Sequence, residues 1–307
     1  MPIISSSTSA FYERSRTNMK DLRKEAEKLQ AQLGSGQKLS RSSDNPVAAS
    51  RLRTLSRQES ISSIDTTNAN RANADLSLAD SAMSSMGSAI IRAQELAGQA
   101  SNSTLTDEQR GAIAVEMDQI FQDLVALANS RASNGQALFG GEAAGDAYSI
   151  DASGNAVYIG TASSGDLPIG DGQTVGRSMT GPQILNFTDA NGNATDILST
   201  IKALSNALKG GVANPAGAAS DSLDVLRVGL DNLTTSQTVV GTRLAWLDVV
   251  ADRRVEISEL RDTEQADLGS TDIPSTVAQL QETMTVLEAS QASFTRLANL
   301  SLFDNLR

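Results

Sequence analysis

Apolar residues recur at alternating steps of three and four positions near both ends of the chain. This spacing predicts helices that each bury one narrow seam against a partner helix. The seam in residues 10–33 consists of Tyr12, Ser15, Met19, Leu22, Ala26, Leu29 and Leu33. The seam after Pro274 consists of Val277, Leu280, Met284, Leu287, Gln291, Phe294 and Ala298. Two matching terminal seams indicate that the first and last helices pair antiparallel, with the chain ends together.

Long helical patterns also occupy the chain between these seams. One runs from Pro46 to about residue 101, and its seam of mostly small residues predicts a close approach of helices: Ala72, Leu76, Ala79, Met83, Met86, Ile90, Ala93 and Ala97. A second helix starts at Thr106, which forms a capping box with Gln109, and runs to about residue 133. Its seam consists of Ile113, Met117, Ile120, Leu124 and Leu127. Further helices are predicted over 195–209 and 219–268.

The middle of the chain has a different character, because residues 140–193 contain 11 of the 23 glycines. The stretch "AYSIDASGNAVYIG" predicts two short strands around a turn, and "QILNFTDANGNA" predicts a third. The expected fold is therefore mainly α: an elongated antiparallel helical bundle or coiled coil of N- and C-terminal segments, with a small β-rich insertion at its tip.

This reading divides the chain into five segments. They are an N-terminal assembly arm (1–45), the N-terminal part of a helical rod (46–139), a glycine-rich β insertion domain (140–193), the C-terminal part of the rod (194–272) and a C-terminal assembly arm (273–307).

The stretch "LGSGQKLSRSSDNPVAAS" (33–50) separates the first two helices. Its glycines and lysine suggest a phosphate loop, but the Walker pattern and a preceding strand are both missing. A helix break explains it better. Gly34 or Gly36 ends the first helix, Asp44 or Asn45 caps the next, and Pro46 occupies its first position.

Composition narrows the possible chemistry. The chain has no cysteine or histidine, which excludes thiolate nucleophiles, disulfides and His-based acid–base catalysis. Its net charge of −11 argues against non-specific nucleic-acid binding. The segment Asp189–Asp196 resembles a calcium loop, but Gly192 is misplaced and no glutamate closes it, so a turn is predicted. We predict no enzyme activity, no catalytic residues, no cofactor and no metal site.

The sequence also lacks an N-terminal secretory signal and an apolar run long enough to cross a bilayer, so no membrane insertion is expected. Charge differs between the two ends. Residues 1–60 carry 11 basic and 6 acidic side chains, whereas residues 243–307 carry 6 and 11. These opposite charges favour pairing of the arms with each other or with the arms of neighbours. The alternative is that both are solvated helix faces.

Four stretches resemble the bacterial flagellin superfamily, and most closely its hook-associated proteins at the hook–filament junction. "LGSGQKLSRSSDNPVAASRL" is similar to the family's N-terminal helix break, with Asn45 in place of an aspartate. "RASNGQALFGG" is similar to the step into the variable domain. "VGTRLAWLD" and "LEASQASFTRLANLSLFDNLR" resemble the start of the long C-terminal helix and the C-terminal arm. The resemblance covers about 1–140 and 195–307.

The resemblance implies a structural protein of the extracellular flagellum that joins hook to filament. It implies export by the type III apparatus with a chaperone and without a cleaved signal. It also implies self-assembly into a ring, between a hook-side hook-associated protein and flagellin, and arms that fold only on assembly. We expect the assembly contacts at Tyr12, Met19, Leu22, Leu29, Leu33, Met284, Leu287, Phe294, Leu297, Leu300 and Phe303.

Two alternative functions remain. A flagellin that forms the filament itself would have the same fold. A surface module that binds polysaccharide would use the aromatic residues of the insertion, Tyr148, Tyr158 and Phe187.

Overall fold

The computed structural model describes residues 3–304, with side-chain surroundings for 10–297. The chain divides into two compact units: Met1–Ser60 with Glu256–Arg307, and Ile61–Val255. The division passes through the two longest helices, α2 (Pro46–Ala100) and α6 (Pro215–Gly269), which contribute to both units.

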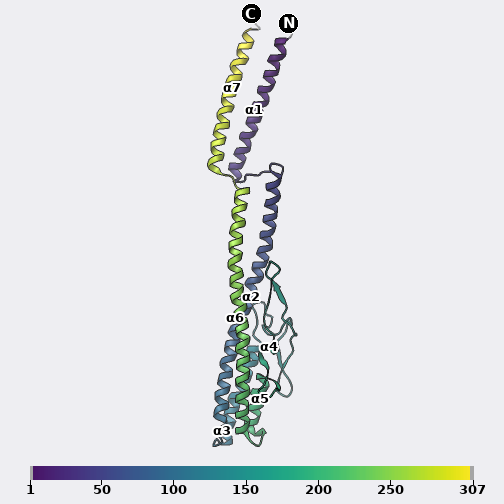
Figure 1. Ribbon diagram of the computed structural model, residues 1–307, viewed down its shortest axis with the longest axis vertical. Helices are drawn as coiled ribbons and strands as arrows, with labels where there is room; N and C mark the ends of the chain where they lie inside the picture. The colour runs from purple at the N-terminus through teal and green to yellow at the C-terminus, as the bar shows by residue number, and fades with distance from the viewer. Residues whose placement is uncertain (1–2, 305–307) are drawn as a thin grey trace. The chain divides into compact units, whose positions relative to one another are not determined.

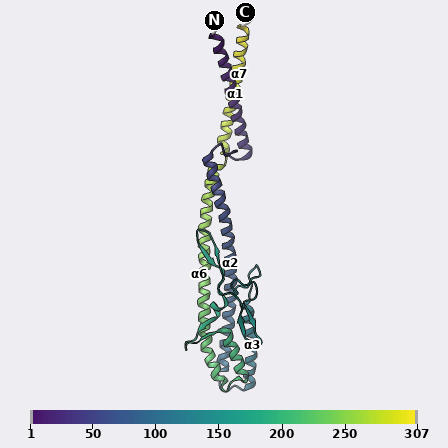
Figure 2. The same cartoon turned by 90° about the vertical axis from the view of Figure 1, so that its right-hand side faces the viewer.

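The first unit contains the paired terminal helices. α1 (Ile3–Ser35) and α7 (Ile273–Asp304) lie side by side and antiparallel, and their outer ends lie together (Figure 1, Figure 2). The first turns of α2 run beside the last turns of α6, where Arg51 forms an ion pair with Glu264. The terminal seams of the sequence thus produce the antiparallel pairing that they predicted.

The second unit is a helical bundle built from the rest of α2 and α6, α3 (Asp107–Ala128) and α5 (Ile197–Asn206), which continues into a π-helical turn, η1 (Ala207–Gly211). The eight predicted seam residues between Ala72 and Ala97 are each at most 1% exposed. Alanines at four of these positions shorten the side chains on that face, so neighbouring helices approach closely and exclude water.

The capping box that starts α3 is confirmed. Thr106 accepts a hydrogen bond from the Gln109 amide, and the Gln109 side chain accepts one from the Thr106 amide. The end of α3 comes about five residues earlier than predicted, at Ala128. The side chain of Asn129 is the reason: it binds the backbone of Ala147 and Tyr148 through three hydrogen bonds and draws the chain out of the helix. Gly135, at a φ of 81°, then forms a turn beyond the helix.

The glycine-rich segment folds into three antiparallel hairpins and a short helix, α4 (Gly181–Leu185). The hairpins pair β1 (Tyr148–Ile150) with β2 (Ala156–Tyr158), β3 (Asp166–Pro168) with β4 (Thr174–Gly176), and β5 (Asn186–Thr188) with β6 (Ala194–Asp196). The first was predicted. The third is a complete hairpin instead of one strand, and it continues through Asp196 before α5 begins. The second was missed because its strands contain Pro168 and Gly176, residue types that are rare in strands.

The first and third hairpins share one turn, "DAxGNA", although they lie 38 residues apart. In each turn a carboxylate oxygen, on Asp151 or Asp189, accepts two backbone N–H groups, and glycine takes a positive φ. These bonds hold the pKa of both carboxyl groups below the usual value, with the amides of Asn155 and Asn193 as the largest causes. The predicted turn at Asp189 is therefore stabilised by its own backbone.

The insertion does not form a tip domain of its own, which corrects the expected layout. It packs against the side of the bundle and shares its core through Phe139, Ile169 and Ile184 (Figure 1). Polar contacts add to this packing, because Asp75 of α2, 5% exposed in its side chain, forms an ion pair with Arg177 at 3.8 Å. Large apolar residues scattered among the glycines make the segment part of one core. The five-segment scheme remains a proposal about assembly.

We predict that Asn129→Ala destabilises the second unit, because it leaves three backbone groups at Ala147 and Tyr148 without partners. The expected loss is about 2–4 kcal/mol of unfolding free energy. Urea denaturation followed by the fluorescence of Trp246, the chain's only tryptophan, which packs partly buried against this core, measures it. Asn70→Ala, at an exposed site on α2, is the matched control. Equal stability of the two variants would contradict the assigned role of Asn129.

Candidate assembly interface and helix break

The terminal helix pair buries little of its apolar surface. Among the side chains described in α1 and α7, the apolar ones that are buried are Ala26, Leu29 and Leu287, with exposures of 5%, 4% and 7%. Tyr12, Met19 and Phe294 are half-buried, whereas Met284 is 38% exposed and Leu297 is 44% exposed. A pair of helices about 30 residues long therefore retains apolar surface that one partner does not cover.

An aromatic contact joins the outer parts of α1 and α7. The rings of Tyr12 and Phe294 meet edge to face, with centroids 5.4 Å apart and planes at 84°. The Tyr12 hydroxyl also donates to the carbonyl of Leu297 at 3.5 Å. Edge-to-face pairing adds to area burial and fixes the relative position of two residues, so this contact sets the register of the pair.

A groove of about 340 Å³ runs along one side of the same pair. Its apolar walls include Phe11 and Met19 from α1, and Val286, Phe294 and Leu297 from α7. Phe11 and Val286 are 42% and 44% exposed and were not among the predicted contacts. They lie one position before Tyr12 and Leu287, so they form a second apolar stripe beside the seam. The sequence signal for this stripe is an apolar residue directly next to a seam residue on each helix.

The predicted contact residues thus fall into distinct groups. The structure brings Tyr12, Phe294 and Leu297 together and buries Leu29 and Leu287. Met19, Leu22 and Leu33 are half-buried on α1, and Met284 is exposed on α7. Leu300 and Phe303 lie outside the residues whose side chains are described. Whether these residues contact other subunits stays a prediction.

The described ion pairs of α1 lie within that helix. In the described part of α1, Arg16 pairs with Glu13 and Lys28 with Glu25. No ion pair between α1 and α7 occurs among the side chains described there, although Arg51 of α2 reaches Glu264 of α6. The charge difference between the ends therefore contributes one bridge within the chain and leaves most arm charges facing outward.

Gly36 terminates the first helix. It has a φ of 68°, and its amide donates to the carbonyl of Gln32 at 2.8 Å, which satisfies an end carbonyl of α1. Gly34, in contrast, lies inside α1, and a Cβ added there would meet nothing within 4 Å. Only Gly36 needs the conformational freedom of glycine at this end.

Two adjacent residues, Asp44 and Asn45, shape the chain where the next helix begins. Asp44 accepts hydrogen bonds from the Ser40 hydroxyl and the Arg41 amide, at 3.0 and 2.9 Å, and closes a turn. The Arg41 amide is the largest cause that holds the pKa of the Asp44 carboxyl below its usual value. The Asn45 side chain accepts from the Ala48 amide at 3.1 Å and so caps α2, which begins at Pro46.

Candidate chemistry elsewhere is sparse. The described residues contain no group of three or more His, Cys, Asp or Glu side chains placed to hold a metal ion. Within 3–304, no helix combines the length and apolarity that a membrane span requires.

Of the aromatic residues considered for polysaccharide binding, Tyr148 is 6% exposed and stacks edge to face on Tyr158. Phe187 packs partly buried on the core. The buried Tyr148 ring serves packing, so little aromatic surface remains to support the polysaccharide alternative.

Comparison with known proteins finds similarity to flagellar proteins. The bacterial flagellin N-terminal helical region matches residues 7–144. Flagellar hook-associated protein 3 of Escherichia coli K12 is 28% identical over 312 residues, which cover 97% of this chain and 98% of that protein. The protein of Salmonella typhimurium LT2 with the same name is equally similar, with the same coverage.

Two solved structures share the fold. A structure from Vibrio parahaemolyticus, assigned to a flagellar hook-associated protein, has a TM-score of 0.67 at 22% identity and covers 74% of this chain and 100% of its own. The flagellar junction protein FlgL from Legionella pneumophila has a TM-score of 0.58 at 15% identity, with coverage of 72% and 100%. At these identities the likeness concerns the fold alone.

The match over 7–144 supports a flagellin-family protein. The paired terminal helices and the bundle with its glycine-rich insertion agree with it. Within that family the chain is similar to hook-associated protein 3, which it matches along nearly its whole length. The resemblance inferred from the sequence is thus confirmed.

Proposed function

We propose that this chain is a structural component of the bacterial flagellum that joins the hook to the filament. The observation that carries the proposal is the near-complete coverage by hook-associated protein 3 of Escherichia coli, which extends through both terminal helices. The fold of a flagellar junction protein from Legionella pneumophila supports it. The role is mechanical and non-enzymatic: the chain associates with other axial components of the flagellum.

The paired terminal helices are the assembly surface in this proposal. Their shared groove leaves Phe11, Val286 and Leu297 more than 40% exposed, and neighbours in a ring would cover these side chains. Apolar area removed from water contributes roughly 25 cal/mol per Å², so covering the groove favours assembly. The outward-facing charges of the arms would select and orient the neighbour.

The partners follow from the same role. On one side the ring would contact a hook-side hook-associated protein, and on the other the first flagellin subunits. Subunits would reach this extracellular position through the type III export apparatus, with a chaperone and without a cleaved signal. Export in an unfolded form suits terminal helices that bury as little as α1 and α7 do.

Leu287→Asp should prevent assembly, because Leu287 is 7% exposed in the helix pair. The second unit is a separate bundle and should stay folded, which the fluorescence of Trp246, packed against its core, reports. Placing an unpaired carboxylate at a buried site costs several kcal/mol. We expect the variant to export poorly or detach from hooks, with no filament in a strain that lacks the native gene. Normal motility would show that the seam is assigned incorrectly.

Gln281→Asp is the matched control for that experiment. Gln281 lies on the same helix, is exposed and takes no part in the groove, so it receives the same charge at a solvated site. Filaments should form at the normal frequency. Loss of filaments in both variants would show that α7 tolerates no added charge at any position, which would contradict the specific role assigned to the seam.

A flagellin role is the second candidate, favoured by the flagellin N-terminal match over 7–144. Deletion of the gene separates the two functions. A junction protein should leave intact hooks without filaments and flagellin released into the medium. Filaments that still form after deletion would contradict the junction role, and long filaments assembled from the purified chain alone would favour the flagellin role.

A further inference from the structure

Two connections of unequal length cross between the arm helices and the helices that follow them. Residues 36–45 join α1 to α2, whereas only residues 270–272 join α6 to α7. Both connections belong to the first unit, so their contacts with each other are defined. The difference in length requires the longer connection to store several residues of chain.

Backbone hydrogen bonds tie the two connections together beside α1 and α6. The Lys38 amide donates to the Gly269 carbonyl at 2.8 Å, and the Thr271 amide donates to the Gly36 carbonyl at 3.0 Å. Gln37 and Ser270 pair as an antiparallel bridge between them. The Gln32 side chain, at the end of α1, also donates to the Lys38 carbonyl at 2.7 Å. This backbone tie therefore connects the end of α1 directly to the end of α6.

The connection to α2 is held differently. The spare chain is wound into the turn around Asp44, which is exposed and depends on hydrogen bonds to Ser40 and Arg41. Beyond it, the two-pronged pair of Arg51 with Glu264, at 2.5 and 2.7 Å, joins α2 to α6. Leu55 in the same part of α2 is 1% exposed, and apolar burial of this kind is non-directional. Both charged groups are more than a third exposed, so solvent screens the ion pair and it separates at little cost.

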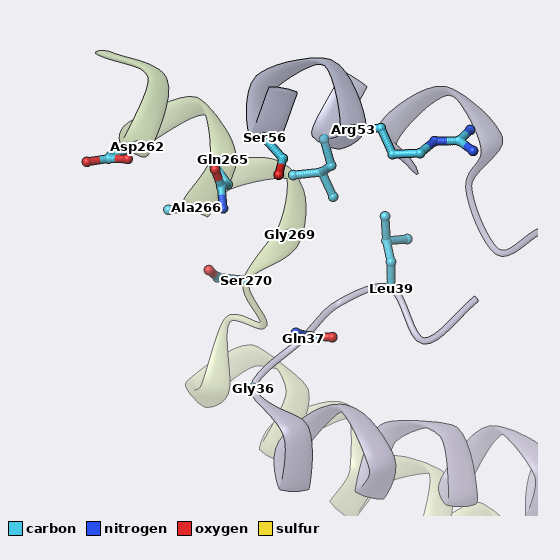
Figure 3. Close-up of a pocket in the computed structure, with 11 residues that line it drawn as sticks. Gly36, Gln37, Leu39, Arg53, Ser56, Asp262, Gln265, Ala266, Gly269 and Ser270 are labelled. Carbon is cyan, nitrogen blue, oxygen red and sulfur yellow. The ribbon is translucent and has the colours of Figure 1, made fainter. Parts of the chain in front are cut away.

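Unfilled space lies next to that weak attachment. A groove of about 530 Å³ opens between the tie, α2 and α6, and Leu39 points from the connection toward α2 (Figure 3). The groove is open to solvent, so the helices beside it have room to shift. The buried Thr271 hydroxyl finds no hydrogen-bond partner, which raises the free energy of the arrangement that the structure shows.

We propose that this joint has one fixed side and one sliding side. The tie holds the α1–α7 pair to α6, while the first turns of α2 slide along α6. During this movement the turn around Asp44 unwinds or rewinds and so changes the reach of the connection. The Arg51–Glu264 ion pair acts as the latch that holds α2 against α6. Small sliding of packed helices is an established mode of conformational change. The device does not depend on whether the chain is a junction protein or a flagellin.

Distances between spin labels in the full-length chain test this directly, because the native sequence contains no cysteine. Cysteine replaces Asp267 of α6 in both labelled pairs, combined with Ala31→Cys for the fixed side or Thr54→Cys for the sliding side; all three sites are exposed. In assembled subunits, where neighbours hold the arms, we expect a narrow distribution for 31–267 and a broader one for 54–267. Equal widths would overturn the proposal.

A second measurement identifies the latch. Glu264→Gln should broaden the 54–267 distribution and leave 31–267 unchanged, whereas Glu259→Gln, at an exposed position of the same helix without a described ion pair, should change neither. If Glu264→Gln behaves like Glu259→Gln, or if it broadens both distributions, the joint does not have a latched sliding side. An unchanged far-ultraviolet circular dichroism spectrum verifies that each variant is folded.

Discussion

The antiparallel pairing of the first and last helices is the interaction on which the first unit depends. It brings together segments almost 300 residues apart through the Tyr12–Phe294 contact. The chain between them must therefore reverse direction and return to its starting point. The same direction reversal places α2 beside α6, where the latch and the backbone tie occur. Without the terminal pairing, neither the joint nor the grooved arm surface would exist.

Burial is distributed very unevenly between the two units, and this difference accounts for their proposed roles. The bundle buries a continuous core that extends from α2 through the hairpins to α6 and includes Phe139, Met83 and Leu226 at 0% exposure. The arms bury single residues such as Leu29 and Leu287. A helix pair with so few buried side chains gains most of its stability from further packing, so neighbouring subunits complete it.

The sequence predicted the elements whose patterns are long and regular. The seam from Ala72 to Ala97, the Thr106 capping box and the paired terminal helices follow from local periodicity and capping chemistry. Features set by distant contacts were missed. The side chain of Asn129 ends α3 early, and strands β3 and β4 contain Pro168 and Gly176, which disfavour a strand assignment. The insertion docks through apolar residues such as Ile169, whose destination no local pattern reveals. The second stripe through Phe11 was present in the sequence as apolar residues next to seam positions, but the regular seam was the stronger pattern.

The central claim is that the arms are thinly stabilised in the single chain and are completed by neighbours. Hydrogen–deuterium exchange of the α1 and α7 amides, in the isolated chain and in the assembled ring, tests it most directly. The account predicts rapid exchange in both arms of the isolated chain, slow exchange in the second unit, and strong protection of the arms after assembly. Arms that are already as protected in the isolated chain as in the ring would contradict it.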